Sequence, residues 1–191
     1  IINCSFGKSF SPKAEWVYDA IKYAASKDVL IVHAAGNDGE DLEDPKNRNY
    51  PNDDMDEDRE FVDNMITVGA LSSSYGSEMV ASFSNYGNQR VDVFAPGAEI
   101  YSTMPNGEYE FQGGTSMAAP AVAGVAALIR SFHPDLSASQ VKNIIMQSGL
   151  RTKASTFDKI SKSGKMVNAY NALILATNIS NGKMTLESNS K

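Results

Sequence analysis

The segment Gly113-Gly114-Thr115-Ser116 carries the residue types of a nucleophilic site. Two glycines precede a serine, and a run of small apolar residues follows it, which is typical of a loop that enters a buried helix. The N-terminus of a helix has free backbone N–H groups and favours negative charge, which suits an oxyanion formed beside a serine nucleophile. Serine and threonine are also common helix caps, and the segment alone leaves both interpretations open.

Two further segments, Ser5-Phe6-Gly7 and Ala34-Ala35-Gly36-Asn37, each follow a short apolar run. In an open parallel sheet, ligands bind beyond the carboxyl ends of the strands, where both segments would lie. Gly36 allows another chain to approach closely, and Asn37 supplies an amide donor. Asn37-Asp38-Gly39 is equally typical of a simple turn, and the spacing alone favours the turn.

A serine nucleophile needs a neighbouring base, and the chain has only two histidines. His133 follows Ser116 by 17 residues, a separation of roughly 25 Å along one continuous helix. His33 lies within an apolar run, roughly 13 Å from Asn37 along a strand. We predict that His33 is a hydrogen-bonded core histidine and that His133 marks a helix exit, so neither is a convincing base.

The elements around these segments form a βαβ pattern. Residues 1–4 and 29–35 have the composition of strands, and apolar residues recur at helical spacing over 12–26, after the start signal Ser11-Pro12. Strands linked in this way are parallel, with a right-handed crossover. The predicted fold class is therefore α/β.

The rest of the chain supplies a long turn-rich loop and further short elements. The loop covers residues 36–64, and apolar segments at 65–70, 91–95 and 100–103 follow it. We predict helices over 115–132, from a capping box at Ser137 through Met146, and over 168–177. Residues 178–191 are predicted to be a polar, frayed tail.

Charge and hydropathy exclude several classes of partner. The net charge is −6, and residues 38–60 alone carry eleven acids and three bases, so the acidity belongs to one loop. Nucleic-acid binding would need a basic face, which is missing. The longest mainly apolar run, 118–129, is shorter than the roughly 20 residues of a membrane span. The single cysteine, Cys4, excludes an intramolecular disulfide.

The acidic loop also raises the question of a metal. Carboxylates at Asp53, Asp54, Asp56, Glu57 and Asp58 are numerous enough for calcium, but the spacing lacks the glycine of an EF-hand loop. A solvated acidic loop is the favoured interpretation. We therefore expect no cofactor, and we name no metal ligand.

Four segments together carry a resemblance to a known family. Residues 114–120, continuing to Ile129, closely resemble the active-site serine segment of the subtilisin-like serine proteases (subtilases). Residues 34–37 resemble the oxyanion-hole segment of that family, residues 2–7 the strand that lines its substrate cleft, and residues 91–97 the segment that precedes the nucleophile. The segments occur in the order of the family and cover residues 1 to about 148.

The resemblance implies a role for each matching residue. Ser116 would be the nucleophile, and the Asn37 side chain and the Ser116 backbone N–H would stabilise the oxyanion. The walls of the primary specificity pocket would be Ser5, Phe6, Gly7, Ala34, Ala35 and Gly36. Their backbone would pair with an extended peptide or protein substrate.

The chain also departs from the family pattern. In subtilases the catalytic residues occur in the order Asp, His, Ser, and neither the Asp-containing strand end nor a His-Gly-Thr helix start occurs here. We expect both upstream of Ile1. Residues 1–177 would then be the C-terminal part of a subtilisin-like catalytic domain whose sheet is incomplete on its N-terminal side.

These expectations define a function. The parent protein would be a serine endopeptidase that acts through an acyl-enzyme on Ser116, and the 191-residue chain alone would be inactive. The missing N-terminal segment would be its partner, and the exposed sheet edge would favour association with other chains. A secreted or cell-envelope location is expected from the family alone.

Two alternatives remain. The chain could be a non-catalytic relative that holds a peptide or pro-segment. It could also be an α/β-hydrolase whose nucleophile elbow is Gly114-x-Ser116-x-Ala118, with Asp and His after the serine. The latter needs His133 as base and a strongly apolar strand before the elbow, for which residues 109–112 are a poor candidate. In a related family with an acid triad, an acid occupies the position of Asn37, which argues against that family.

Overall fold

The computed structural model describes residues 1–54, 59–152 and 157–187. At its centre four parallel strands pair in chain order, which confirms the α/β class. The strands are β1 (Ile2–Cys4), β2 (Ile31–Ala34), β3 (Met65–Leu71) and β4 (Val93–Pro96). β2 and β3 are buried along their whole length, because helices or loops cover both faces of the sheet.

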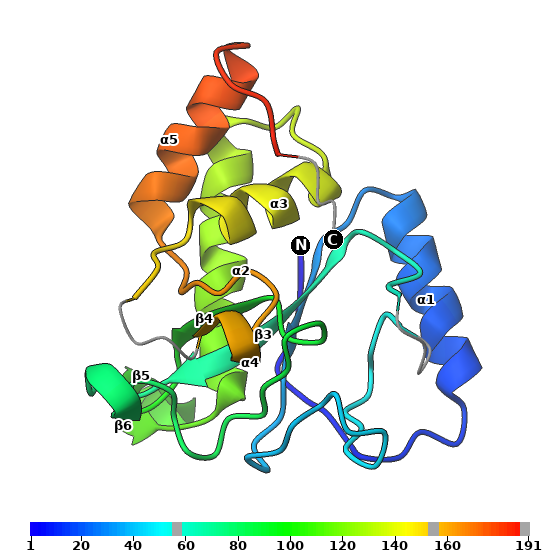
Figure 1. Cartoon of the computed structure of the whole chain (residues 1–191), viewed down its shortest axis with the longest axis vertical. Helices are drawn as coiled ribbons and strands as arrows, with labels where there is room; N and C mark the ends of the chain where they lie inside the picture. Colours follow the sequence, from blue (N-terminus) through cyan, green and yellow to red (C-terminus); the bar gives the residue numbers. More distant parts are fainter. Residues whose placement is uncertain (55–58, 153–156, 188–191) are drawn as a thin grey trace.

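Helices cover the sheet from opposite sides (Figure 1). The helix α1 (Ala14–Ser26) connects β1 to β2 and packs on one face through Tyr18, Ile21 and Ala24. On the other face lies α2 (Thr115–Phe132), followed by α3 (Ala138–Ser148) and α5 (Ala169–Ser180). The main core lies between this group of helices and the strands.

The helix α2 packs closely because its buried side chains are small. Ala118, Ala119 and Ala126 are fully buried against strand residues that include Val32 and Val68. By length and composition α2 is also long enough and apolar enough to cross a membrane. The apolar run 118–129 within it is shorter than a membrane span, so the sequence did not predict this. A core helix of a soluble protein passes the same test, so this finding is weak evidence for a membrane span.

The helix boundaries correct two predictions. The helix α1 begins at Ala14 rather than residue 12, because the chain first makes a turn over residues 12–13, and Lys13 occupies the cap position without a side-chain bond. The helix α5 continues to Ser180, past the predicted end at residue 177. Residues 188–191 of the predicted tail lie outside the described residues.

The capping box of α3 is confirmed. The Gln140 N–H donates to Ser137 Oγ at 3.2 Å, and the Ser137 N–H donates to Gln140 Oε1 at 2.9 Å.

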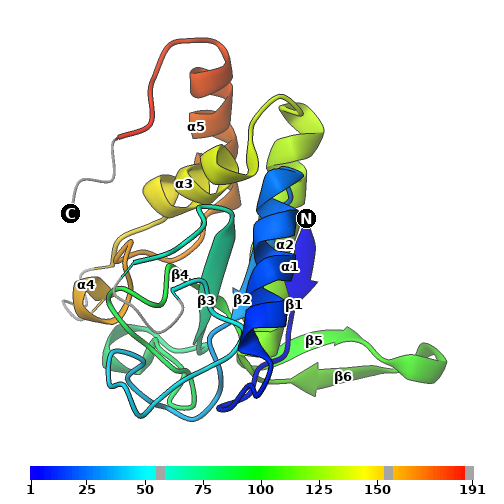
Figure 2. The same ribbon diagram turned by 90° about the vertical axis from the view of Figure 1, so that its right-hand side faces the viewer.

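A hairpin leads from the sheet to α2. Its strands β5 (Ile100–Thr103) and β6 (Tyr109–Gln112) are antiparallel and extend away from the body of the protein (Figure 2). The two strands are joined by the short helix η2 (Pro105–Gly107), in which Asn106 has a φ of 63°. The remaining elements are η1 (Gly76–Glu78) and α4 (Phe157–Ile160). Because β6 is exposed, it differs from the buried strand that an α/β-hydrolase elbow requires.

The two edges of the parallel sheet differ. The outer edge of β4 is covered, since the Phe94 N–H donates to the Lys165 carbonyl at 3.1 Å and the Val167 N–H donates to the Phe94 carbonyl at 2.8 Å. Among the described residues, β1 pairs only with β2. Ile1 and Ile2 are 40% and 46% exposed there, so apolar side chains lie at an open edge.

A buried lysine attaches the acidic loop to the core. Lys142 of α3 is 4% exposed, and its Nζ lies 2.8 Å from Glu60 Oε2 and 3.6 Å from Asp92 Oδ1. Glu60 also binds Lys162 at 2.6 Å. Burial by itself lowers the pKa of Lys142, but the carboxylates of Asp92, Asp53 and Glu60 outweigh burial and raise it. Lys142 therefore stays charged and balances buried carboxylates.

We predict that Lys142→Met lowers the free energy of unfolding by about 3–5 kcal/mol, because it leaves buried carboxylates without their cation. Urea denaturation of both proteins measures the change. Lys159→Met, at an exposed position of α4, is the matched control and should change the unfolding free energy by less than about 0.5 kcal/mol. Equal stability of the two variants would contradict a structural role for this cluster.

Candidate active site

Ser116 lies in the first turn of α2, as the sequence predicted, and is half-buried. Its Oγ donates to the Ser5 carbonyl at 3.1 Å, and Ser5 Oγ donates to the Ser116 carbonyl at 2.7 Å. Asn3 supports this pair, because its Nδ2 donates to Ser5 Oγ at 2.9 Å. The end of β1 and the start of α2 are thus joined directly at the predicted nucleophile.

Asn37 lies beside the same turn of α2. Its Oδ1 accepts from the Thr115 backbone N–H at 2.8 Å and from Thr115 Oγ1 at 3.0 Å. Thr115 Oγ1 in turn accepts from the Gly36 N–H at 3.1 Å. Because the amide oxygen is occupied twice, the orientation of the amide is fixed, and Nδ2 remains as its donor.

Glycines allow this close approach between the end of β2 and the start of α2. Gly114 has a φ of +154°, and a Cβ there would lie 3.4 Å from Asn37 Nδ2. The Gly114 N–H donates to the Gly97 carbonyl at 2.8 Å. Gly97 ends the segment 91–97, so the structure brings all four family-like segments to one place.

The predicted pocket walls, residues 5–7 and 34–36, lie on either side of Asn49. Asn49 Nδ2 donates to the Ala34 carbonyl at 2.9 Å. A Cβ on Gly7 would lie 2.2 Å from Asn49 Oδ1, and one on Gly36 would lie 3.4 Å from Asn49 Cγ. The sequence analysis missed Asn49, because it lies in the acidic loop and no local pattern distinguishes it from a turn asparagine.

The remaining wall residues differ in exposure. Ala34 and Ala35 are buried, Ser5 and Gly36 are half-buried, and Phe6 and Gly7 are exposed. Phe6 is 63% exposed. The accessible part of this surface is therefore the segment after β1, whereas the end of β2 is largely covered.

Neither histidine is positioned to serve Ser116. His33 is 1% exposed, and its Nε2 lies 3.0 Å from the Phe6 carbonyl, as expected of a hydrogen-bonded core histidine. His133 follows the last residue of α2 and bonds to Thr177 Oγ1 at 3.0 Å. It lies at the opposite end of the helix from Ser116. The sequence holds no third histidine.

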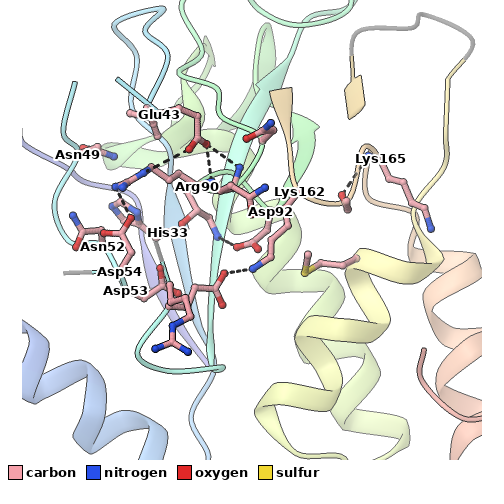
Figure 3. A pocket seen from close by; sticks show the side chains of 18 of the residues that line it. His33, Glu43, Asn49, Asn52, Asp53, Asp54, Arg90, Asp92, Lys162 and Lys165 are labelled. Carbon is pink, nitrogen blue, oxygen red and sulfur yellow. Dashed lines mark hydrogen bonds and ion pairs between the residues drawn. The ribbon is translucent and has the colours of Figure 1, made fainter. Parts of the chain in front are cut away.

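A cavity of about 850 Å³ lies between the acidic loop and α3, and His33 and Thr67 form part of its wall (Figure 3). On its wall Arg90 pairs with Asp54, and Glu43 Oε1 accepts from the Gln89 and Arg90 N–H groups at 2.8 and 3.2 Å. The expectation of a solvated acidic loop is therefore wrong for Glu43, Asp54 and Glu60. Their carboxylates are held by basic side chains and backbone amides that lie far away in the sequence.

The candidate calcium ligands fall partly outside the structure. Asp53 and Asp54 are described, and Asp56, Glu57 and Asp58 lie outside the described residues. Within residues 1–54, 59–152 and 157–187, no three His, Cys, Asp or Glu side chains form a metal-binding group. Calcium binding by the complete loop is untested.

The arrangement supplies part of the chemistry of acyl transfer. The Ser116 hydroxyl stands in the first turn of α2, and both Asn37 Nδ2 and the Ser116 backbone nitrogen lie close to Gly114, at 3.4 and 3.6 Å from the place of a Cβ there. Such donors stabilise an oxyanion when they are held in place before the reaction. Neither histidine of the chain is placed to take the Ser116 proton.

Comparisons with known proteins agree with this geometry. The sequence profile of the subtilase family (Peptidase_S8) matches residues 1–176. Subtilisin DY of Bacillus licheniformis is 40% identical over 143 residues, which are 75% of this chain and 47% of that protein. The major intracellular serine protease of Bacillus subtilis is 38% identical over 117 residues, 61% of this chain and 33% of its own length.

A solved structure shares the fold. The solved structure described as the structural basis of subtilase cytotoxin SubAB assembly superposes on this chain with a TM-score of 0.77 at 26% sequence identity. The match covers 95% of this chain and 61% of that one. This chain therefore spans less than half of the two curated relatives and under two thirds of that structure.

We predict that His33 makes stability depend on pH. Burial lowers the pKa of His33 to about 4 from 6.5, although its bond to Phe6 acts in the opposite direction. The unfolded chain therefore binds a proton between these values that the folded chain does not. Stability is fully present above pH 6.5 and falls by about 3 kcal/mol as the pH drops to about 4.

The measurement is the free energy of unfolding from pH 4 to 7 for the wild type and His33→Gln, which keeps a donor and cannot titrate. The difference between the two curves should change by about 3 kcal/mol over this range. His133→Gln, which changes the other histidine, is the control. Parallel curves for the wild type and His33→Gln would rule out this role of His33.

Proposed function

Because this chain belongs to the subtilase family, we propose that residues 1–177 are the C-terminal part of a serine endopeptidase domain that hydrolyses peptide bonds through an acyl-enzyme on Ser116. One observation carries the proposal. Thr115 binds both to Asn37 Oδ1 and to the Gly36 N–H, and so holds an amide donor beside the serine that follows it in the chain. A helix cap or a simple turn does not require this bridge.

The chemistry starts at the substrate carbonyl carbon. Ser116 Oγ forms a bond to it while the hydroxyl proton passes to a base, and the oxyanion accepts from Asn37 Nδ2 and the Ser116 N–H. The proton then goes to the leaving amine as the C–N bond breaks, and water hydrolyses the ester. The histidines of this chain bind other groups, and we propose that the base and its orienting acid come from residues upstream of Ile1.

Substrate would bind along the end of β1. The Ser5 carbonyl now accepts from Ser116 Oγ, so it already receives a hydrogen bond at the position where a substrate N–H would donate. An extended peptide that pairs with residues 5–7 would take this acceptor and free the hydroxyl. Its side chain next to the scissile bond would then face Asn49, between the two walls.

The open edge of β1 supports the proposal of an upstream segment. A strand from that segment would pair there and cover Ile1 and Ile2, and its neighbouring helices would cover apolar side chains such as Trp16 and Val17, which are 70% and 37% exposed. Without this segment the same edge would favour association between copies of the chain.

For location we propose secretion or the cell envelope. Family membership does not fix this, because one relative is named as an intracellular protease. Detection of the parent protein in culture medium or envelope fractions, rather than in the cytoplasm, tests it.

We predict that the isolated 191-residue chain does not cleave peptides and that the polypeptide containing the upstream segment does. The measurement is cleavage of a peptide library, together with labelling of Ser116 by a fluorophosphonate probe. Ser116→Ala in the longer polypeptide is the control and should abolish both signals.

Efficient cleavage by the isolated chain would contradict the proposal of missing catalytic residues. Peptide binding without cleavage or labelling by the longer polypeptide would instead favour the alternative, a non-catalytic relative that holds a peptide or pro-segment.

We also predict that calcium leaves the melting temperature unchanged, because Glu43, Asp54 and Glu60 already have cationic partners or amide donors. Scanning calorimetry with calcium and with a chelator measures this. A rise of several degrees with calcium would assign a site to the loop that includes Asp56, Glu57 and Asp58.

A further inference from the structure

Asn85 is a buried asparagine that no part of the mechanism above uses. Its side chain is 1% exposed, and it lies in the loop between β3 and β4. Its Oδ1 accepts from the Asp38 and Glu40 backbone N–H groups, both at 3.0 Å. Its Nδ2 donates to the Ala35 carbonyl at 3.0 Å. One amide therefore binds the backbone on both sides of Asn37.

The backbone near Asn85 also binds the turn that residues 35–40 form around Asn37. The Asn85 N–H donates to the Gly36 carbonyl at 3.0 Å, and the Gly39 N–H donates to the Phe83 carbonyl at 2.9 Å. The position of Asn85 is itself fixed, because Ser84 Oγ donates to the Asn85 carbonyl at 3.0 Å and accepts from the Ala70 N–H at 2.9 Å. The turn is thus attached through Ser84 to the buried strand β3.

The space around Gly36 fits this arrangement. Gly36 has a φ of +104°, and a Cβ there would lie 2.4 Å from Asn85 Nδ2. The asparagine amide therefore occupies the space that a side chain at position 36 would need. Asn85 therefore leaves no room for a side chain at position 36.

We propose that Asn85 is a positioning residue of the oxyanion site, which acts through the backbone of residues 35–40 to set the direction of the Asn37 amide. Thr115 holds that amide from the side of α2, and Asn85 holds its backbone from the opposite side. This inference rests on the proposed function, in which Asn37 is the oxyanion donor.

The physical reason is that an oxyanion donor such as the Asn37 amide stabilises the transition state less when its backbone can move. A donor stabilises the transition state fully only when it is held in place before the reaction. Loss of the Asn85 amide leaves the Asp38 and Glu40 N–H groups and the Ala35 carbonyl without their partner, and the turn gains freedom. Asp38 and Glu40 lie outside the pocket wall of residues 34–36, and Asn49 and Thr115 also hold that wall, so kcat should fall while KM changes little.

The first test uses the 191-residue chain. Amide hydrogen exchange followed by NMR should show that Asn85→Ala removes protection at Asp38 and Glu40 and leaves it intact in β3, for example at Val68. Asn88→Ala, at an exposed position of the same loop, is the matched control and should leave all of these amides protected. Unchanged protection of Asp38 and Glu40 in Asn85→Ala would overturn the inference.

The second test uses the intact protease with its upstream segment, in a double-mutant cycle of Asn37→Ala and Asn85→Ala. We expect Asn85→Ala to lower kcat about tenfold to hundredfold, less than the about 10²–10³-fold known for removal of the oxyanion asparagine of subtilisin. Because Asn85 acts through Asn37, the double variant should be no slower than Asn37→Ala alone. Effects that multiply in the double variant would overturn the inference.

A peptide aldehyde forms an oxyanion-like adduct with the nucleophile. Its inhibition constant reports on the oxyanion site and does not change when the protein is merely less stable. This constant should rise in Asn85→Ala in parallel with the fall in kcat/KM, while KM changes little. An inhibition constant equal to that of the wild type would contradict the role. An inactive wild-type protease would refute the proposed function alone, and the exchange experiment would still decide whether Asn85 holds the turn.

Discussion

The site depends on one amide oxygen, Oδ1 of Asn37, which accepts two hydrogen bonds from Thr115. The two residues are 78 positions apart in the chain, and their contact joins the end of β2 to the start of α2. Because this oxygen is occupied, the amide can present only its N–H₂ group to a ligand. The positive φ angles of Gly36 and Gly114, and the small residues of α2, allow the two backbones to approach closely enough for the contact.

A second constraint acts on the acidic loop. The segment that follows Asn37 carries the net negative charge of the protein, and buried charge is costly unless it is paired. Lys142, Lys162 and Arg90 supply the pairing through Glu60 and Asp54. The loop is thus held at its start by neutral amide bonds from Asn85 and near its end by ion pairs. The carboxylates of Glu43, Asp54 and Glu60, three of its eleven, therefore have partners within the fold.

The sequence predicted the parallel sheet, the helix that carries Ser116 and the capping box of α3, because each depends on residues close together in the chain. The resemblance to subtilases also named Ser116 and Asn37 as neighbours. It did not indicate Asn85 or Asn49, whose partners are set by loop packing rather than by a local pattern. The start of α1 was wrong by two residues, since Ser11-Pro12 forms part of a turn before the helix. Lys142 has helical spacing typical of a surface lysine, so its burial was not predictable.

The sequence by itself determined most of the secondary structure, the segment that carries Ser116 and the presence of only two histidines, because periodicity, turn chemistry and residue inventory can be read from short stretches of chain. Only the tertiary structure decided which carboxylates are paired, that the Ser5 carbonyl binds Ser116, and that the backbone around Asn37 is held by Asn85. These contacts join residues 36 to 111 positions apart, and their partners are selected by the packing of the sheet and its helices. No local pattern specifies which distant groups that packing brings within hydrogen-bond distance.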